Sequence, residues 1–292
     1  MTSTDDRSLL LTLQHYAKLV HESAIAPPLI QQRGYQSLPQ PEDLIDRGFS
    51  KAQAKVAPAL GIPLWDAHGQ RHGWQIRPDV PRQFKDGTLG KYETPLGDRN
   101  ILDIHPSVQP LVGDPATPLW ITEGVRKGDA LASQGQCAIA LIGGVWGFRG
   151  TNDHGGKVIL PDWEYVALNG RLVYVVYDSD IYQKRNVELA LKALYRLLRE
   201  RHARPGLVRW PEEYRQAKIG VDDFLAQGHT LEEVLAMVPS MGPLPTVAAA
   251  QRNGHALQPQ SRAETLLTDT SNAVAFVADH GHKLRYCYPW KT

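Results

Sequence analysis

Three acidic residues stand where metal-dependent chemistry could occur, because each follows an apolar run typical of a buried β-strand. Glu123 ends the run PLWITE (118–123), and Asp178 and Asp180 end the run LVYVVYDSD (172–180). Ligands of open parallel sheets bind beyond the carboxyl ends of the strands, so we expect the three acids at one edge. Residues two apart on a strand share a side, with Cα atoms roughly 6.6 Å apart. Asp178 and Asp180 could therefore converge on one cation.

Two interpretations of these acids compete. Carboxylates held this close repel one another by about 1 to 4 kcal/mol per pair. A hard divalent cation removes that penalty, which favours Mg²⁺, with Mn²⁺ as a substitute. Alternatively, Asp178 or Asp180 could cap the helix expected to start near Tyr182. Glu123, at the end of a second strand, favours the metal site.

The elements needed to position these acids are visible from residue 117 onward. Short apolar runs at 117–123, 137–142, 172–180 and 206–210 alternate with amphipathic stretches, the longest of which starts near residue 182. Two further helices are expected at 220–228 and 230–238, the second opened by a Thr230/Glu233 capping box. Strands alternating with helices predict an α/β fold whose parallel sheet is covered on both faces.

The first third of the chain mixes helices with a hairpin. We expect a helix at 9–20, a short helix opened by a Ser50/Gln53 capping box, and a strand–turn–strand at 61–77. The segment 78–100 is rich in Pro, Gly and charge, and long loops of this kind are usually functional. Basic residues gather at 71–92 and at 183–204. Both stretches could contact phosphates, although a solvated charged face is the plainer alternative.

Composition restricts the class of protein. The chain has 292 residues, 42% of them hydrophobic and 22% charged, which suits a soluble globular protein. No apolar run approaches 18 residues, and no signal peptide is visible, so we expect no membrane association and a cytoplasmic location. Two cysteines, Cys137 and Cys287, are too few for a disulfide framework or a four-cysteine zinc site.

The motifs themselves carry a family resemblance. ITEG (121–124), LIGGVWG (141–147) and VVYDSD (175–180) resemble the signature of the TOPRIM domain, which topoisomerases, bacterial replicative primases and some nucleases share. IPLWDAHGQRHGWQIR (62–77) and GKYETP (90–95) resemble the basic subdomain that precedes TOPRIM in bacterial DnaG-type primases. KIGVDDFLAQG (218–228) resembles the late acidic element of the same domain. Residues 268–290 resemble the segment leading into the helicase-associated domain of phage and plasmid primase-helicases.

The resemblance implies a TOPRIM-type, Rossmann-like parallel sheet flanked by helices and preceded by a smaller α+β basic subdomain. It places the N-terminal subdomain at 1–115 and the TOPRIM domain at 116–238. A Pro- and Gln-rich linker follows at 239–263, and 264–292 would begin a truncated helicase-associated domain. An ATPase motor, if present, would lie beyond residue 292.

The resemblance also implies roles for individual residues. Glu123 would act as acid/base group or metal ligand, Asp178 and Asp180 would hold Mg²⁺, and Asp222 or Asp223 would add a carboxylate to a second ion. Template backbone or incoming nucleotide phosphates would be held by basic and aromatic side chains, namely Arg77, Arg82, Lys91, Tyr92, Lys127 and Lys218. The implied activity is DNA-primase nucleotidyl transfer from NTPs on single-stranded DNA, upstream of a helicase.

The chain departs from the primase pattern in two places. An acid usually follows the Glu-Gly pair after a few residues, whereas Arg126 and Lys127 come here before Asp129. No N-terminal cysteine/histidine zinc module is present, so the resemblance does not extend to autonomous sequence-specific priming. A nuclease using the same acids and a non-catalytic DNA-binding or loading module remain alternative functions.

The glycine turn and the tryptophans have less specific interpretations. Gly143, Gly144 and Gly147 are not followed by the Gly-Lys-Ser/Thr of a P-loop, and we expect them to turn the backbone close to the acids. The tryptophans near strand ends, Trp120, Trp146, Trp163 and Trp210, could stack bases, although packing is the commoner role.

Overall fold

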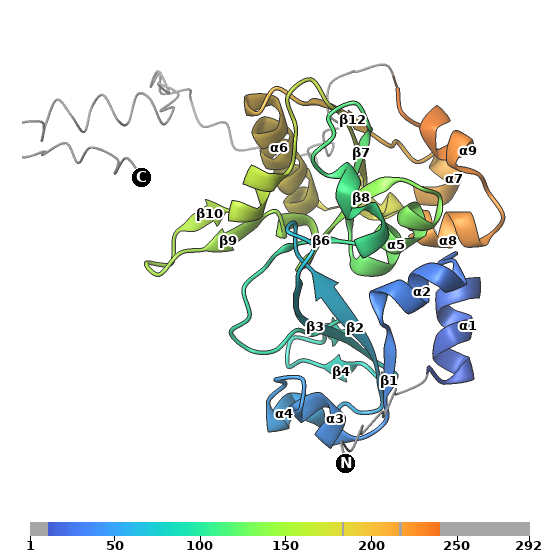
Figure 1. Cartoon of the computed structure of the whole chain (residues 1–292), viewed down its shortest axis with the longest axis vertical. Helices are drawn as coiled ribbons and strands as arrows, with labels where there is room; N and C mark the ends of the chain where they lie inside the picture. Colours follow the sequence, from blue (N-terminus) through green and yellow to red (C-terminus); the bar gives the residue numbers. More distant parts are fainter. Residues whose placement is uncertain (1–10, 183, 216–217, 240–292) are drawn as a thin grey trace, which may run out of the picture. The chain divides into compact units, whose positions relative to one another are not determined.

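The computed structural model describes residues 11–239, apart from 183 and 216–217 (Figure 1). The described residues belong to one compact unit. The predicted segment 264–292, and all of the predicted linker except residue 239, lie outside the described residues. The proposed boundary between residues 115 and 116 stays a prediction.

A five-stranded sheet forms the centre of the fold, with strand order β12-β11-β7-β8-β6. Its strands are β6 (Leu102–Ile104), β7 (Leu119–Glu123), β8 (Cys137–Leu141), β11 (Leu172–Val176) and β12 (Arg204–Leu207). The β12–β11, β11–β7 and β7–β8 pairs are parallel, and only β6 runs antiparallel, beside β8. The predicted α/β class with a mostly parallel sheet is therefore confirmed.

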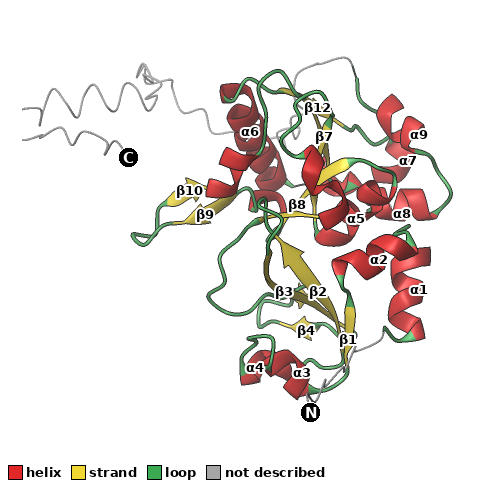
Figure 2. Ribbon diagram, in the orientation of Figure 1, coloured by secondary structure: helices red, strands yellow, loops and turns green. Residues whose placement is uncertain are grey.

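Helices lie on both sides of the central sheet (Figure 2), and the alternation of side chains along each strand determines which helix each residue contacts. Ile121 and Val175 pack in one apolar cluster with Leu194 of α6 (Arg185–Glu200). Their neighbours Trp120 and Val176 point to the opposite face. That face is covered by α5 (Val125–Ser133), α8 (Val221–Ala226) and α9 (Leu231–Ala236). Both faces are buried, as expected for a mostly parallel sheet.

The N-terminal part builds a second, antiparallel sheet of order β1-β2-β3. Its elements are α1 (Leu13–His21), α2 (Pro27–Arg33), β1 (Gln36–Leu38), α3 (Pro41–Ile45), α4 (Lys51–Ala54), β2 (Ala59–Trp65) and β3 (Arg71–Pro78). The predicted Ser50/Gln53 capping box opens α4. Helix α1 begins at Leu13, four residues later than expected, because the Thr12 side chain accepts a hydrogen bond from the backbone N–H of His15.

Short elements fill the connections. The loop 78–100 contains a two-stranded ladder of β4 (Arg82–Gln83) and β5 (Leu89–Gly90). A second hairpin pairs β9 (Arg149–Thr151) with β10 (Lys157–Ile159), and α7 spans Glu212–Arg215. Turns of 3-10 helix are η1 (Pro106–Leu111), η2 (Gly144–Trp146), η3 (Pro161–Tyr165) and η4 (Ser179–Tyr182). Among the described residues, none of the helices has the length and apolar content needed to cross a membrane.

The two sheets share buried contacts. Ile30 of α2 and Ile62 of β2 pack in one cluster with Val125 and Ile142, which flank the central sheet. In addition, β6 belongs to the central sheet although it precedes residue 116. The N-terminal part is therefore attached to the central sheet by a common core and by a strand.

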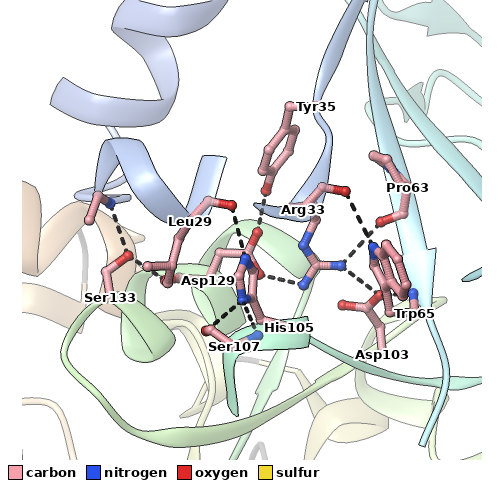
Figure 3. A network of polar contacts seen from close by, with 11 residues as sticks. Leu29, Arg33, Tyr35, Pro63, Trp65, Asp103, His105, Ser107, Asp129 and Ser133 are labelled. Atoms are coloured by element: carbon pink, nitrogen blue, oxygen red, sulfur yellow. Dashed lines mark hydrogen bonds and ion pairs between the residues drawn. The ribbon is translucent and has the colours of Figure 1, made fainter. Parts of the chain in front are cut away.

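A buried polar network adds a third connection (Figure 3). The Arg33 guanidinium, at the end of α2, donates hydrogen bonds to Asp103 Oδ1 of β6 at 2.8 Å and to Asp129 of α5. Tyr35 donates to Asp129 Oδ2 at 2.7 Å, and the backbone N–H of Trp65 donates to Asp103 Oδ1 at 2.9 Å. All three charged side chains are almost completely buried. Each carboxylate thus needs the single guanidinium between them.

Candidate functional site

Glu123 and Asp178 meet at the carboxyl edge of the central sheet. Glu123 is the last residue of β7, and Asp178 follows the end of β11, which pairs with β7. The Glu123 Oε1 atom accepts a hydrogen bond from the Asp178 backbone N–H at 3.1 Å. The structure therefore brings these two predicted site residues together.

Asp180 lies in a turn after β11 and not on the strand, although it is close enough for its charge to raise the pKa of Glu123. Strand β11 ends at Val176, so Asp178 and Asp180 are not two residues of one strand, and Asp180 belongs to the η4 turn. Its Oδ2 atom pairs with Lys184 Nζ at 2.6 Å and with Lys218 Nζ at 3.4 Å. Burial alone would raise the pKa of Asp180, but the hydrogen bond from Lys184 and the nearby lysine charges lower it. The prediction that both aspartates share a strand face was wrong.

Neither aspartate caps the following helix. The N-cap residue of α6 is Lys184, and no side-chain hydrogen bond caps that end. The alternative interpretation of Asp178 and Asp180 as helix caps is therefore also wrong.

A third carboxylate comes from α8. Asp222 is 3% exposed, and its Oδ1 atom has no hydrogen-bond partner among the described residues. A side chain placed on Gly220 would put its Cβ 2.6 Å from Asp222 Oδ1 and 3.1 Å from Asp178 Oδ1. The two aspartates therefore face the same small space, which only a glycine leaves open. Glu123, Asp178 and Asp222 are called the acid cluster below.

Asp223 has a local structural role as well. Its Oδ2 atom accepts a hydrogen bond from the Gly220 backbone N–H at 2.9 Å, which caps the start of α8. This contact fixes the turn that brings Asp222 to the acid cluster.

A lysine lies inside the acid cluster. Lys127 Nζ is 2.8 Å from Asp178 Oδ1 and donates a hydrogen bond to the Glu123 backbone carbonyl at 3.2 Å. Burial would lower the pKa of Lys127, but the negative charges of Asp178, Asp222 and Glu123 raise it. Arg126 Nη2 is 3.9 Å from Asp222 Oδ2. Lys127 is therefore held in its charged form.

The carboxyl groups of the cluster carry an electrostatic penalty. Burial raises the pKa of Glu123, and the charge of Asp178 raises it further, while Lys127 offsets part of the shift. Burial likewise raises the pKa of Asp222, with Lys127 and Arg126 opposing. Further positive charge near Glu123 and Asp222 would therefore favour the ionised forms of these two carboxyl groups.

A cavity of about 530 Å³ opens next to the acid cluster. It is called the main cavity below. Most of the site residues predicted from the sequence line it, namely Arg77, Lys91, Tyr92, Glu123, Lys127, Asp178, Lys218, Asp222 and Asp223. Its wall thus carries both basic and acidic side chains, and both kinds come from segments far apart in the chain.

A backbone bridge places the basic residues on this wall. Ile76 and Glu93 exchange hydrogen bonds of 2.8 and 3.0 Å, which ties the loop carrying Lys91 and Tyr92 to β3 beside Arg77. Arg82 was also expected to contact nucleotide or template. It is not among the residues that line the main cavity, because its guanidinium pairs with Glu93 at 2.8 Å.

The main cavity also contains residues that sequence reasoning missed. Gln75, Thr94, Asn100 and Arg126 line it. Gln75 could have been found, because it lies two residues before Arg77 on the same strand and shares its face. Nothing in the sequence marks Asn100. Gly143 and Gly144 line the cavity too, which confirms their expected place near the acids.

The four tryptophans near strand ends differ in burial. Trp120, Trp163 and Trp210 are completely buried and serve as core. Trp146 is partly exposed, and the Arg149 guanidinium carbon lies 3.6 Å from its ring centroid. Only Trp146 of these four could stack on a base.

The donor atoms of the acid cluster are of the kind that binds a hard cation, but their arrangement in this structure is not that of a metal site. Its donors are carboxylate oxygens, which Mg²⁺ prefers, and the buried Oδ1 of Asp222 has no partner among the described residues. Within residues 11–239, gaps excepted, however, no group of three or more His, Cys, Asp or Glu side chains is arranged to hold a metal ion. The ammonium of Lys127 is the nearest counter-charge of Asp178.

Comparison with protein families finds a match for residues 109–231 to a domain of unknown function, DUF3854. An uncharacterized protein of a Picosynechococcus strain is 30% identical over 125 residues. That stretch covers 40% of this chain and 12% of the relative. The chain thus matches only a small part of that relative's length.

Solved structures resemble the described fold more completely. The Aquifex aeolicus primase, comprising its zinc-binding and RNA polymerase domains, has a TM-score of 0.51 at 16% identity. The likeness covers 79% of this chain and 57% of that one. A DnaG primase catalytic domain bound to single-stranded DNA has a TM-score of 0.50 at 15% identity, covering 79% and 75%. The fold is therefore similar to that of primase catalytic domains.

Proposed function

We propose that this chain is a TOPRIM-type, Mg²⁺-dependent nucleotidyltransferase that synthesises primers on single-stranded DNA. It would be the primase module of a phage- or plasmid-type replication protein whose helicase lies elsewhere. The observation that carries this proposal is the main cavity, which is lined both by the acid cluster and by Arg77, Lys91 and Lys218. The fold likeness to primase catalytic domains supports it.

Phosphoryl transfer requires that negative charge be neutralised and that the reacting oxygens be aligned. Glu123, Asp178 and Asp222 would hold the Mg²⁺, which would supply charge neutralisation at the reacting phosphate. Arg77, Lys91 and Lys218 would bind the phosphates of the incoming NTP or the template. Asp180 would act mainly by orienting Lys218, with which it pairs at 3.4 Å. Tyr92 would contact the sugar–phosphate backbone from the same wall.

A second cavity supports a path for a single strand. It has a volume of about 690 Å³ and shares Asn100 and Gly143 with the main cavity. Arg149, Lys157 and Trp146 also line it. Basic side chains that track a backbone, with an aromatic ring available for stacking, are typical of single-strand binding surfaces.

Primer synthesis tests the proposal. Incubation with single-stranded template, NTPs and Mg²⁺ should yield short oligonucleotides, and Glu123→Gln and Asp178→Asn should abolish them. Glu164→Gln is a matched control, since this exposed carboxylate pairs with Arg201 away from both cavities. Absence of product from the unaltered protein at all template sequences would contradict the proposal.

The same variants separate the alternatives. Shortening of labelled DNA without NTPs, lost in Asp178→Asn, would identify a nuclease that uses the same acids. DNA binding with every activity intact in Asp178→Asn would identify a non-catalytic loading module.

A further inference from the structure

Helix α6 carries a row of exposed basic side chains that the proposed function leaves unused. Four of its exposed residues are basic and line neither the main cavity nor the second one, namely Arg185, Lys192, Arg196 and Arg199. Each residue of an α-helix advances by about 100° around the axis, so these four lie within about 60° of one another. At about 1.5 Å per residue they span about 21 Å along the helix. They are called the basic stripe below.

The opposite side of α6 is fixed in the core. Its residues there are buried and pack in one apolar cluster with the central sheet, namely Val187, Leu191, Leu194 and Leu198. The packed side holds the helix in place on the sheet. The basic stripe is therefore presented outward from a fixed support.

Most of the positive charge of the basic stripe has no opposite charge beside it. In the part of the chain that the structure describes, Lys192 is the one member with an ion pair, to Glu188 at 2.6 Å. The other exposed acid of α6, Glu200, lies about 100° around the axis from Arg199. A row of like charges of this kind attracts a polyanion.

The surroundings of α6 favour nucleic acid over a membrane as that polyanion. A helix that lies on a membrane inserts its apolar face, whereas α6 buries its apolar face in the core. Leu189 is its one large apolar residue on the exposed side. The basic stripe also begins next to Asn186, whose Oδ1 atom accepts a hydrogen bond from Trp146 Nε1 at 2.9 Å. It therefore starts beside the second cavity and continues away from it.

The composition of the basic stripe favours a duplex over a single strand. Surfaces for single strands combine basic groups with aromatic rings on which bases stack. The basic stripe has no aromatic member, and Tyr195 of the same helix is buried. A duplex of the B form carries about one phosphate charge per 1.7 Å of its axis, so about twelve charges would lie along the 21 Å of the stripe. A straight row of cations suits such a backbone.

We propose that the basic stripe of α6 binds the phosphate backbone of duplex nucleic acid without regard to base sequence. Arginine is suited to this contact, because its planar guanidinium donates paired hydrogen bonds to phosphate oxygens. If the proposed function holds, the duplex is the primer paired with its template, and only this identification rests on that function. The binding itself requires neither NTPs nor a metal ion.

Fluorescence anisotropy tests the proposal with the full chain, a labelled duplex and a labelled single strand of equal length. Arg196→Gln combined with Arg199→Gln should weaken duplex binding by about tenfold or more at about 0.1 M salt. The slope of log affinity against log salt should fall by about two units. Affinity for the single strand should stay the same, because that strand follows the second cavity.

Two further variants serve as controls. Arg196→Lys combined with Arg199→Lys keeps both charges and should bind the duplex with the salt slope of the unaltered protein. Lys51→Gln combined with Lys55→Gln removes two charges from exposed lysines of α4 that line neither of these two cavities. Duplex affinity should not change in this second control.

Three results would overturn the inference. These are an unchanged duplex affinity in the glutamine variant of α6, an equal loss in the glutamine variant of α4, and an equal loss for the single strand. Sedimentation of the unaltered protein with phosphatidylserine vesicles, without duplex binding, would make the basic stripe a membrane-binding face and overturn it too.

The failure of this inference can be told apart from the failure of the proposed function. A protein that binds duplex through the basic stripe and makes no oligonucleotides would refute the primase proposal alone. A protein that makes oligonucleotides, and whose glutamine variant of α6 binds duplex normally, would refute this inference alone.

Discussion

Ser179 and Ile219 exchange two hydrogen bonds across the site. The Ser179 backbone N–H donates to the Ile219 carbonyl at 3.0 Å, and the Ile219 N–H donates to Ser179 Oγ at 2.9 Å. Ser179 is completely buried between Asp178 and Asp180, and Ile219 is followed directly by Gly220. The contact therefore joins the segment after β11 to the start of α8 and sets the separation of Asp178 and Asp222.

Ser179→Ala should loosen the acid cluster. The substitution leaves the buried Ile219 N–H without its acceptor, which costs about 1–3 kcal/mol of unfolding free energy. Urea unfolding measures that loss, and Mn²⁺ titration should show weaker binding. Thr88→Ala removes an exposed hydroxyl that donates to Asp86, and should change neither the unfolding free energy nor the Mn²⁺ affinity. Full Mn²⁺ affinity in Ser179→Ala would show that another contact fixes the two segments.

Arg33→Met should be among the most destabilising single substitutions. Asp103 and Asp129 would then be buried without the guanidinium that they share, at a cost of about 3–5 kcal/mol. Urea unfolding of this variant should show the loss. Lys192→Met, which breaks an exposed i,i+4 pair, should cost about 0.5 kcal/mol or less. If Arg33→Met and Lys192→Met lost similar amounts of unfolding free energy, the buried network would stabilise the fold no more than an exposed ion pair does.

Lys91→Ala should weaken template or nucleotide binding without affecting stability. Lys91 is exposed and lines the main cavity, so removing it takes away one phosphate contact and little packing. Fluorescence anisotropy with labelled single-stranded DNA should show a salt dependence reduced by about one unit of slope. Lys85→Ala, an exposed lysine of the same loop outside the main cavity, is the matched control. If Lys91→Ala and the unaltered protein bound single-stranded DNA with equal affinity, Lys91 would not be a phosphate-binding residue.

Asp222→Asn should stabilise the metal-free protein at neutral pH. Burial raises the pKa of Asp222 above its unfolded value of about 3.9. Such a group favours folding below the unfolded pKa, and that contribution is lost as pH rises through the folded pKa. Asparagine does not ionise, so the variant should gain on the unaltered protein as pH rises from about 4 through the raised folded pKa of Asp222. Urea midpoints across this range measure the gain, and a difference that does not vary with pH would contradict it.

Arg149→Ala combined with Lys157→Ala should lower affinity for single-stranded DNA if the second cavity carries the strand. The slope of log affinity against log salt should fall by about one unit for each phosphate that the variant no longer binds. DNA should also quench the fluorescence of Trp146 in the unaltered protein. Arg196→Ala, on the exposed side of α6, should leave affinity unchanged. If the double variant and the unaltered protein bind with the same salt slope, the strand follows another surface.

The sequence predicted the sheet and much of the site because both depend on short-range patterns. Apolar runs identified β7, β8 and β11, and the acids at their ends identified Glu123 and Asp178. It misplaced Asp180, because the apolar pattern continues through the buried Tyr177 and does not show that β11 stops at Val176.

The sequence could not predict contacts between segments that are far apart in the chain. Nothing near Arg33 indicates that its partner is Asp129, 96 residues later. The sequence likewise does not show that Gly220 leaves room for Lys127. The first pairing arises only when α2 packs against α5, and the second only when α5 and α8 pack on one face of the sheet.

The antiparallel strand β6 matters for how this protein can be divided. Residues 102–104 pair with residues 139–141 of β8, so β8 is an interior strand only while they are present. A shortened protein starting at residue 116 would expose the unpaired N–H and C=O groups of a fully apolar strand, Cys137–Leu141. Such an edge is a template for association with other chains, and aggregation of the isolated C-terminal half would follow from the missing neighbour.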